Sequence, residues 1–164
     1  MKAKKVILIV GNMGAGKSTL CQILSEKLEW KWLAMDNFRN QAQKESWGGE
    51  HEAQKELLYQ LLNTDLSIYE TTAHGNTYHT VMKLLRKHQI SHLTIKLECS
   101  PEICHSRLME RNSLPNFPKR MNLWNSLWLL HDSLEKVQAH LSINVASNTP
   151  EEIATAILDT LSKK

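Results

Sequence analysis

Residues 11–19 read Gly11-Asn12-Met13-Gly14-Ala15-Gly16-Lys17-Ser18-Thr19 and match the pattern G-x-x-x-x-G-K-[ST] without a mismatch. The motif follows the short apolar run 5–10, whose β-branched residues predict a buried strand. The apolar positions after the motif recur with the spacing of one helix face: Leu20, Ile23, Leu24 and Leu28. A strand, a glycine-rich loop and a helix, in this order, form the context in which the pattern binds phosphate.

The loop supplies the contacts that a nucleoside triphosphate needs. Gly11, Gly14 and Gly16 let the backbone turn sharply and approach an anion without a Cβ in the way, so that successive amides point into one concavity. We expect Lys17 to reach the β- and γ-phosphates and the Ser18 hydroxyl to ligate Mg²⁺. The alternative, a glycine-rich turn that binds nothing, is disfavoured by the flanking segments. All nine residues of the loop are therefore expected to bind ATP with Mg²⁺.

The bulk composition is that of an ordinary globular domain. The chain has 164 residues, enough for one domain with a core, and we expect residues 1–164 to form a single one. Its formal net charge of +3 does not demand nucleic acid, and it does not oppose an anionic substrate. The three cysteines are sparse, which is typical of reduced thiols. The apolar run before the loop is too short for a signal peptide or a membrane span. We therefore expect a cytoplasmic protein with no membrane partner.

Strand-like and helix-like segments alternate along the chain, which predicts an α/β domain with a mostly parallel sheet. The expected strands cover residues 4–10, 30–34, 66–69, 92–98 and 142–146. The expected helices cover residues 17–28, 37–46, 50–63, 74–88, 101–111 and 122–141, and a last helix opens with a capping box at Thr149. Residues 112–121 contain two prolines and are expected to form a short lid.

Polar residues follow the second and third strands, at the edge of the sheet where ligands gather. Asp36 is expected to face the γ-phosphate and to act as a general base, with a helix cap as the alternative. Arg39, one turn later, would bind an anionic group of the acceptor. Glu70 and Thr71 end the third strand and are expected to contact the acceptor. Glu70 would hold a substrate hydroxyl or a metal-bound water, with a surface carboxylate as the alternative.

Three arginines suit phosphoryl transfer, in which charge develops on the transferred group. Arg107 and Arg111 are four residues apart and share one helix face, and Arg120 ends the expected lid. The alternative is that they are solvated basic residues. Trp124 and Trp128 are also four residues apart; we expect them in the core, with a stacking wall for a base as the alternative.

A thiol pair, Cys99 and Cys104, lies beside His105 in the sequence. The spacing of the two cysteines is wrong for common zinc sites and no second pair exists. We therefore interpret them as core or surface thiols.

These motifs resemble those of the small P-loop kinases, the group that includes adenylate, shikimate and gluconate kinases. The resemblance covers essentially the whole chain and is strongest to the polynucleotide 5′-hydroxyl kinases and related predicted AAA-type kinases. It is carried by residues 11–19, by Asp36-x-x-Arg39, by Glu70-Thr71-Thr72, and by Arg107 and Arg111 before a short lid. One departure is Glu70, where polynucleotide kinases usually carry aspartate.

The resemblance implies a three-layer P-loop NTPase fold with a five-stranded parallel sheet in the order 2-3-1-4-5. It implies that Asp36 is the general base, that Arg39 contacts a phosphate of the acceptor or transition state, and that Arg111 contacts the donor phosphates. It also implies an adenine pocket near Arg107 and Asn148.

The expected activity is transfer of the γ-phosphate of ATP to a hydroxyl, with Lys17, Asp36, Arg111 and Arg120 as catalytic residues. The acceptor is either a nucleic acid 5′-hydroxyl or a small molecule such as a sugar, metabolite or antibiotic. A nucleotide-binding module without transfer activity is a third interpretation. Asp36 and the arginine-bearing lid favour a kinase, because a switch needs neither.

Overall fold

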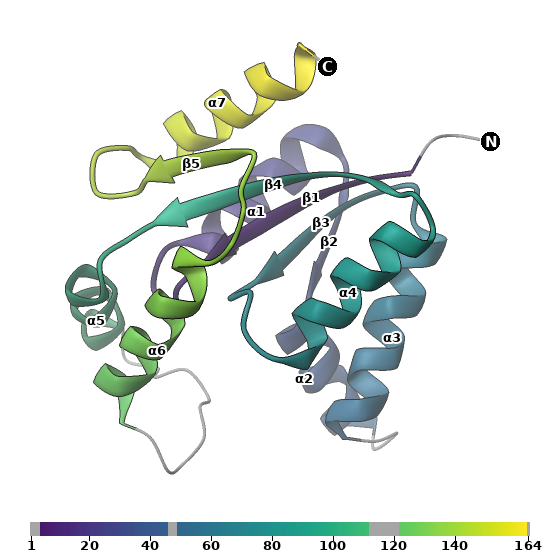
Figure 1. Cartoon of the computed structure of the whole chain (residues 1–164), viewed down its shortest axis with the longest axis horizontal. Coiled ribbons are helices and arrows are strands. Elements are labelled where there is room, and N and C mark those ends of the chain that lie inside the picture. The colour runs from purple at the N-terminus through teal and green to yellow at the C-terminus, as the bar shows by residue number, and fades with distance from the viewer. Residues whose placement is uncertain (1–3, 46–48, 112–121, 164) are drawn as a thin grey trace.

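The structure is a computed structural model that describes residues 4–45, 49–111 and 122–163 (Figure 1). Its strands are β1 (Lys5–Gly11), β2 (Lys31–Ala34), β3 (Leu66–Thr71), β4 (Ser91–Glu98) and β5 (Leu141–Asn144). Its helices are α1 (Lys17–Leu28), α2 (Met35–Glu45), α3 (Glu50–Asn63), α4 (Asn76–Lys87), α5 (Pro101–Glu110), α6 (Leu123–Glu135) and α7 (Pro150–Ser162). The expected lid, residues 112–121, lies outside the described residues.

The five strands form one parallel sheet in the order β2-β3-β1-β4-β5, which confirms the predicted fold. The central strand, β1, pairs with β3 on one side and β4 on the other, so that Ile7 lies opposite Ile68 and Leu93. Because every strand runs the same way, all the carboxyl ends meet at one edge. Helices α5 and α6 lie at that edge (Figure 1).

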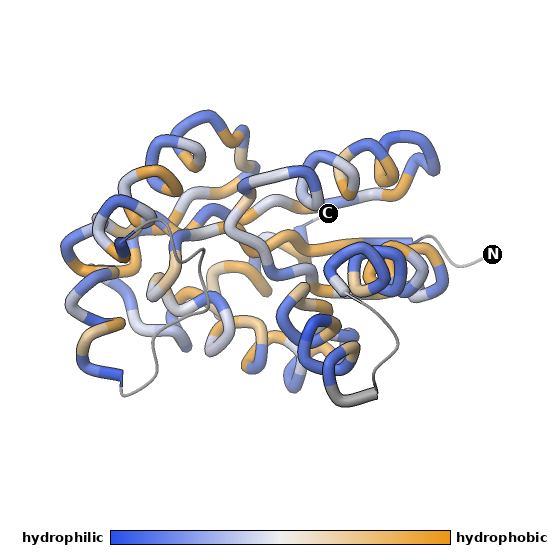
Figure 2. Tube along the Cα trace, turned by 90° about the horizontal axis from the view of Figure 1, so that it is seen from below, coloured by the Kyte–Doolittle hydropathy of each residue, from blue (hydrophilic) through white to orange (hydrophobic). Residues whose placement is uncertain are grey.

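Apolar side chains cover both faces of the sheet, as expected for a parallel sheet between two layers of helices. On one face, Ile7 and Ile9 pack in a core with α1 and α7, through residues such as Leu24 and Ile157. On the other face, Val6, Leu8 and Val10 pack in a second core with α3 and α4. Figure 2 shows the hydrophobic segments gathered inside the molecule and the hydrophilic ones outside. Burial on both faces of the sheet explains why residues 6–10 of β1 are all apolar.

Two helix starts follow directly from local sequence. The Ser100 hydroxyl accepts a hydrogen bond from the Ile103 amide, and Pro101 opens α5. The capping box predicted at Thr149 is confirmed: its hydroxyl accepts from the Glu152 amide at 3.3 Å, and the Glu152 carboxylate accepts from the Thr149 amide at 2.7 Å. None of the described helices is both long enough and apolar enough to cross a membrane.

The structure corrects several predicted element boundaries, and those of α6 and α2 matter most for the site. Helix α6 ends at Glu135 instead of residue 141, because Leu141 pairs with Ile95 of β4 and the His140 amide donates to the Thr94 carbonyl at 2.9 Å. Helix α2 begins at Met35, directly after β2, instead of at residue 37. Asp36 therefore lies in the first turn of α2 and not before the helix.

The prediction that Trp124 and Trp128 lie in the core is wrong. Their exposed fractions are 41% and 39%, because α6 turns a different face inward, the one that carries Leu127, Leu130 and Leu134. The two indole rings meet at nearly a right angle with centroids 6.1 Å apart. The Trp128 ring also meets the His131 ring nearly at a right angle, with centroids 5.6 Å apart.

Candidate functional site

The glycine-rich loop joins β1 to α1 at the carboxyl edge of the sheet, as the motif predicts. Gly14 and Gly16 adopt positive φ angles of 77° and 90°, which other residues rarely adopt. Gly14 also lies against α5: a Cβ there would be 2.8 Å from the Cys104 carbonyl oxygen and 3.0 Å from Leu108 Cγ. This glycine is therefore required for close packing of α5 as well as for the turn.

Lys17 opens α1 and is buried, with an exposed fraction of 8%. Its ammonium donates a hydrogen bond to the Asn12 carbonyl at 2.8 Å, across the loop. Burial lowers the pKa of Lys17, and the Glu70 carboxylate is the largest of the charges that oppose this shift. Asp36 opposes the shift in the same direction, but less than Glu70 does.

Asn12 fastens the loop to α6. Its side-chain amide donates to the Leu127 carbonyl at 2.9 Å, and its side-chain oxygen accepts from the Met13 amide at 2.8 Å. Asn12 is buried, so its hydrogen bond to Leu127 is shielded from water. The loop and the helix after the expected lid are therefore joined directly.

Glu70 links two side chains at the end of β3. The Ser18 hydroxyl donates to one carboxylate oxygen at 2.7 Å, and the Trp32 indole N–H donates to the other at 3.0 Å. Ser18 is the expected magnesium ligand of the loop, and a serine hydroxyl beside a carboxylate offers the oxygen ligands that Mg²⁺ takes. Sequence reasoning missed Trp32, because an indole in a short strand carries no signal for a partner 38 residues away.

A cluster of charges joins α2 to α3. Arg39 donates to Asp36 at 2.6 Å and forms a bidentate pair with Glu50, at 2.6 and 2.7 Å. The hydrogen bond to Glu50 is the main cause that raises the pKa of Arg39, and the same bond lowers the pKa of Glu50. Glu50 was not predicted for the site. It opens a helix, and an acidic residue in a first helical turn is expected whether or not it has a partner.

On the other side of the loop, a cavity of about 180 Å³ brings together residues predicted to bind the nucleotide. It is lined by Ala15, Gly16 and Thr19 of the loop and α1, by Arg107 and Arg111 at the end of α5, and by Asn148 before α7. The Asn148 side chain donates to the Asn144 carbonyl at 2.8 Å, which holds it at this position. Arg120, expected to complete the site, lies outside the described residues.

Thr71 and the thiols lie close to the loop region without joining these clusters. The Thr71 hydroxyl accepts from the Ala73 amide at 3.0 Å and so shapes the turn after β3.

Cys99 and Cys104 are buried free thiols. The Cys104 thiol donates to the Cys99 carbonyl at 4.0 Å, and the interaction with this neighbouring thiol, helped by the charge of Arg107, lowers the pKa of Cys99 to about 7 against the effect of burial. Within the described ranges, no three His, Cys, Asp or Glu side chains are grouped so as to hold a metal.

A phosphate-binding loop at the carboxyl edge of a sheet in the order 2-3-1-4-5, with carboxylates beside its lysine and serine, defines a P-loop kinase. The AAA domain family (AAA_18) matches residues 7–122, and the chain belongs to this family.

Known proteins agree with this class. Over 159 residues the chain is 24% identical to a protein named putative adenylate kinase from Thermococcus kodakarensis, and the alignment covers 94% of this chain and 84% of that protein. A gluconokinase from Sinorhizobium meliloti has a TM-score of 0.69 at 17% identity, covering 99% of this chain and 94% of its own. A shikimate kinase from Acinetobacter baumannii, in complex with shikimate, has a TM-score of 0.66 at 21% identity, covering 99% and 95%. The resemblance to small P-loop kinases expected from the motifs is confirmed.

Proposed function

We propose that the protein transfers the γ-phosphate of ATP to a hydroxyl group of a small molecule. The observation that carries this proposal is the position of Glu70. It accepts a hydrogen bond from Ser18 of the phosphate loop, and in the sheet it lies opposite Ala34, two residues before the exposed Asp36. A phosphate cradle with a solvent-facing carboxylate beside it is suited to transfer and not only to binding.

The donor side of the site is built from the loop. The backbone amides of residues 11–16 and the positive end of α1 would surround the β- and γ-phosphates, with Lys17 as the charged contact. Arg107, Arg111 and Asn148 would contact the nucleoside and the donor phosphates. Ser18, with Glu70 beside it, would hold Mg²⁺, which when bound neutralises part of the charge on the phosphates.

On the acceptor side, Asp36 is proposed to remove the proton of the attacking hydroxyl. The acceptor oxygen forms a bond to the γ-phosphorus as the bond from that phosphorus to the β–γ bridging oxygen breaks, and ADP leaves. Arg39 holds Asp36 through the hydrogen bond at 2.6 Å and so fixes the direction of its carboxylate. Because Asp36 lies in the first turn of α2, its carboxylate stays at the edge of the sheet.

A small acceptor is favoured over a nucleic acid 5′ end by two observations. Arg39 already forms a bidentate pair with Glu50, so a phosphate of the acceptor would have to displace that carboxylate to reach it. The gluconokinase and the shikimate kinase that share this fold are named for small hydroxylated acceptors. The relative named putative adenylate kinase supports a second candidate, in which the acceptor is a nucleoside monophosphate.

The acceptor can be found by following labelled γ-phosphate into a panel that contains gluconate, shikimate, AMP and a 5′-hydroxyl oligonucleotide. Transfer to a small hydroxyl compound supports the proposal, and transfer only to the oligonucleotide contradicts the choice of a small acceptor. Transfer only to AMP supports the second candidate, because the attacking group is then a phosphate oxygen.

Asp36→Asn tests the proposed base. Asparagine keeps the size and the helix position but takes no proton, so we expect kcat to fall by roughly 10²–10⁴ while binding of ATP with Mg²⁺ is retained. Asp65→Asn, at the opposite end of β3, is the matched control and should leave kcat unchanged. If Asp36→Asn transferred phosphate at nearly the normal rate, the base assignment would be wrong and Glu70 would be the next candidate.

A further inference from the structure

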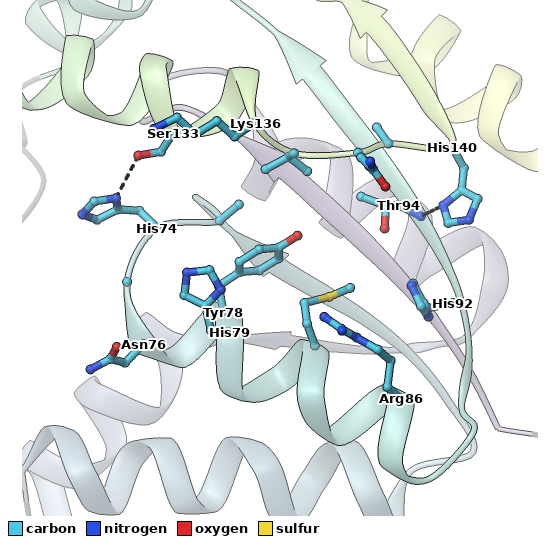
Figure 3. A pocket seen from close by; sticks show the side chains of 16 residues that line it. His74, Asn76, Tyr78, His79, Arg86, His92, Thr94, Ser133, Lys136 and His140 are labelled. Atoms are coloured by element: carbon cyan, nitrogen blue, oxygen red, sulfur yellow. Dashed lines mark hydrogen bonds between the residues drawn. The ribbon is translucent and has the colours of Figure 1, made fainter.

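A second and larger cavity, of about 1080 Å³, opens on the face of the sheet that carries α4 (Figure 3). Its walls are α4, with Tyr78 and Arg86, and the connection from α6 to β5, with Lys136 and His140. Thr94 of β4 lies on its floor. Residues 11–19, Asp36 and Glu70 do not line it, so it is distinct from the candidate nucleotide site.

The lining carries positive charge and no described acidic side chain. Arg86 and Lys136 are the two permanent cations, and neither forms an ion pair with another described residue. Four histidines lie around the same space: His74, His79, His92 and His140. A concave surface lined by one sign of charge concentrates ligands of the opposite sign. The cavity therefore favours an anion.

Hydrogen bonds fix two of the histidine rings within the cavity wall. The Ser133 hydroxyl donates to the Leu129 carbonyl at 3.0 Å, so its oxygen accepts from His74 Nδ1 at 3.0 Å. The Thr94 amide donates to His140 Nδ1 at 3.0 Å, which leaves the ring hydrogen of neutral His140 on Nε2. The rings are held by the fold and do not need a ligand to order them, which lowers the cost of binding one.

The cavity also has an apolar side, formed by Tyr78, Met82 and Val137. These side chains are partly buried against the core of that face of the sheet. Burial raises the pKa of Tyr78 in spite of the nearby Arg86 charge, so the phenol is neutral beside a guanidinium. An aromatic ring next to a cation suits a ligand with both an apolar body and a negative group.

We propose that this cavity binds a small organic anion, in which an apolar or aromatic body carries a phosphate or carboxylate group. Arg86 and Lys136 supply the charge that recognises the anionic group, and Tyr78 with Met82 and Val137 contacts the body. The site is independent of the proposed phosphotransfer, because it shares no residue with the candidate nucleotide site.

Phenyl phosphate is a suitable probe, and the histidine ring signals in the NMR spectrum are a suitable readout. We expect saturable shifts of the signals from the four histidines of the cavity, while those of His51 and His105, which do not line it, stay in place. The titration is run with and without AMPPNP and Mg²⁺, and the same shifts are expected in both. Displacement of phenyl phosphate by the nucleotide analogue would place the probe in the nucleotide site and overturn the proposal.

Variants distinguish recognition of the anion by Arg86 and Lys136 from its attraction to the net positive charge of the protein. Replacing both Arg86 and Lys136 with glutamine removes two charge-assisted contacts and should weaken binding by at least about tenfold. The matched control replaces Lys83 and Lys87 of α4, which do not line the cavity, and changes the net charge equally. Equal binding by the two double variants would overturn the proposal, as would the lack of a saturable shift up to about 10 mM probe.

Two analogues identify the chemistry that is recognised. Benzyl alcohol keeps the ring without the charge and should not saturate the site. Phenylacetate replaces the phosphate with a carboxylate, and its affinity relative to phenyl phosphate shows which anion the cavity prefers. Binding of benzyl alcohol as tight as that of phenyl phosphate would contradict recognition through Arg86 and Lys136.

Discussion

Replacing Gly14 with alanine tests whether the packing of α5 on the phosphate loop stabilises the fold. The Cβ added at Gly14 would lie 2.8 Å from the Cys104 carbonyl oxygen, closer than such atoms approach in proteins, so α5 would have to move. Gly16 provides a matched control. Its φ of 90° is as unfavourable for alanine as the 77° of Gly14, but no atom lies within 4 Å of the added Cβ.

The expected losses of stability follow from this difference. A left-handed backbone costs a residue with a Cβ about 1–2 kcal/mol, and both variants lose this amount. Overpacking adds about 1–3 kcal/mol at Gly14 alone, since the contact is with helix backbone and not with a flexible side-chain end. We therefore expect Gly16→Ala to lower the free energy of unfolding by about 1–2 kcal/mol and Gly14→Ala by about 2–5 kcal/mol.

Urea unfolding followed by circular dichroism, without nucleotide, measures both variants and keeps stability separate from ATP binding. The midpoints should fall in the order normal chain, Gly16→Ala, Gly14→Ala, with the same slope for all three. If Gly14→Ala were no less stable than Gly16→Ala, α5 would not rest on the loop as the structure shows. A changed slope would indicate that the variant alters the unfolded state or the cooperativity instead.

Three more predictions concern the site and the Cys99 thiol near it. Lys17→Ala should lower the rate of ATP turnover by about 10²–10³, because it removes the proposed charged contact with the phosphates. It should not lower the urea midpoint, because burial opposes the charge of this lysine in the folded protein. Glu50→Gln should lower the KM for an anionic acceptor such as gluconate, since Arg39 loses its bidentate partner, and should cost less than about 1 kcal/mol of stability at this exposed position. Cys99 should titrate near pH 7, measured as thiolate absorbance against Cys99→Ser. Because its pKa is lowered from the ordinary 9.0, its contribution to stability should be present above about pH 9 and lost as the pH falls through about 7. Unchanged ATP turnover in Lys17→Ala would contradict its proposed contact with the phosphates. An unchanged KM in Glu50→Gln would contradict the argument that Glu50 keeps Arg39 from the acceptor. A Cys99 titration midpoint near 9.0 would contradict the lowered pKa of this thiol.

Local patterns were sufficient to predict the elements whose structure is set by neighbouring residues. The run 6–10 is apolar throughout because these residues of β1 are buried on both faces of the sheet, and the capping box at Thr149 is contained within four residues. The end of α6 was predicted incorrectly because residues 136–141 contain no helix breaker. The pairing of Leu141 with Ile95 decides that boundary, and this contact joins segments far apart in the sequence.

The same distinction applies to the candidate site. The motif predicted the positions of Lys17 and Ser18, and strand ends predicted that Glu70 would lie nearby; the structure places Glu70 on Ser18. The roles of these residues stay predictions. The Trp32 contact was not predictable, because it depends on β2 lying beside β3.

The spacing of Trp124 and Trp128 identified one face of a helix but could not say which face is buried. The buried face of α6 is the one that carries its leucines, because Leu127 packs in one core and Leu134 in the other.

The lengths of the strands have a consequence for how the molecule behaves at high concentration. The long strands β1 and β4, of seven and eight residues, lie inside the sheet, whereas β2 and β5 at its two margins have only four residues each. An outer strand exposes unpaired amides and carbonyls to which another chain can add itself. Margins this short offer few such groups, so the sheet resists growth into polymers by strand addition.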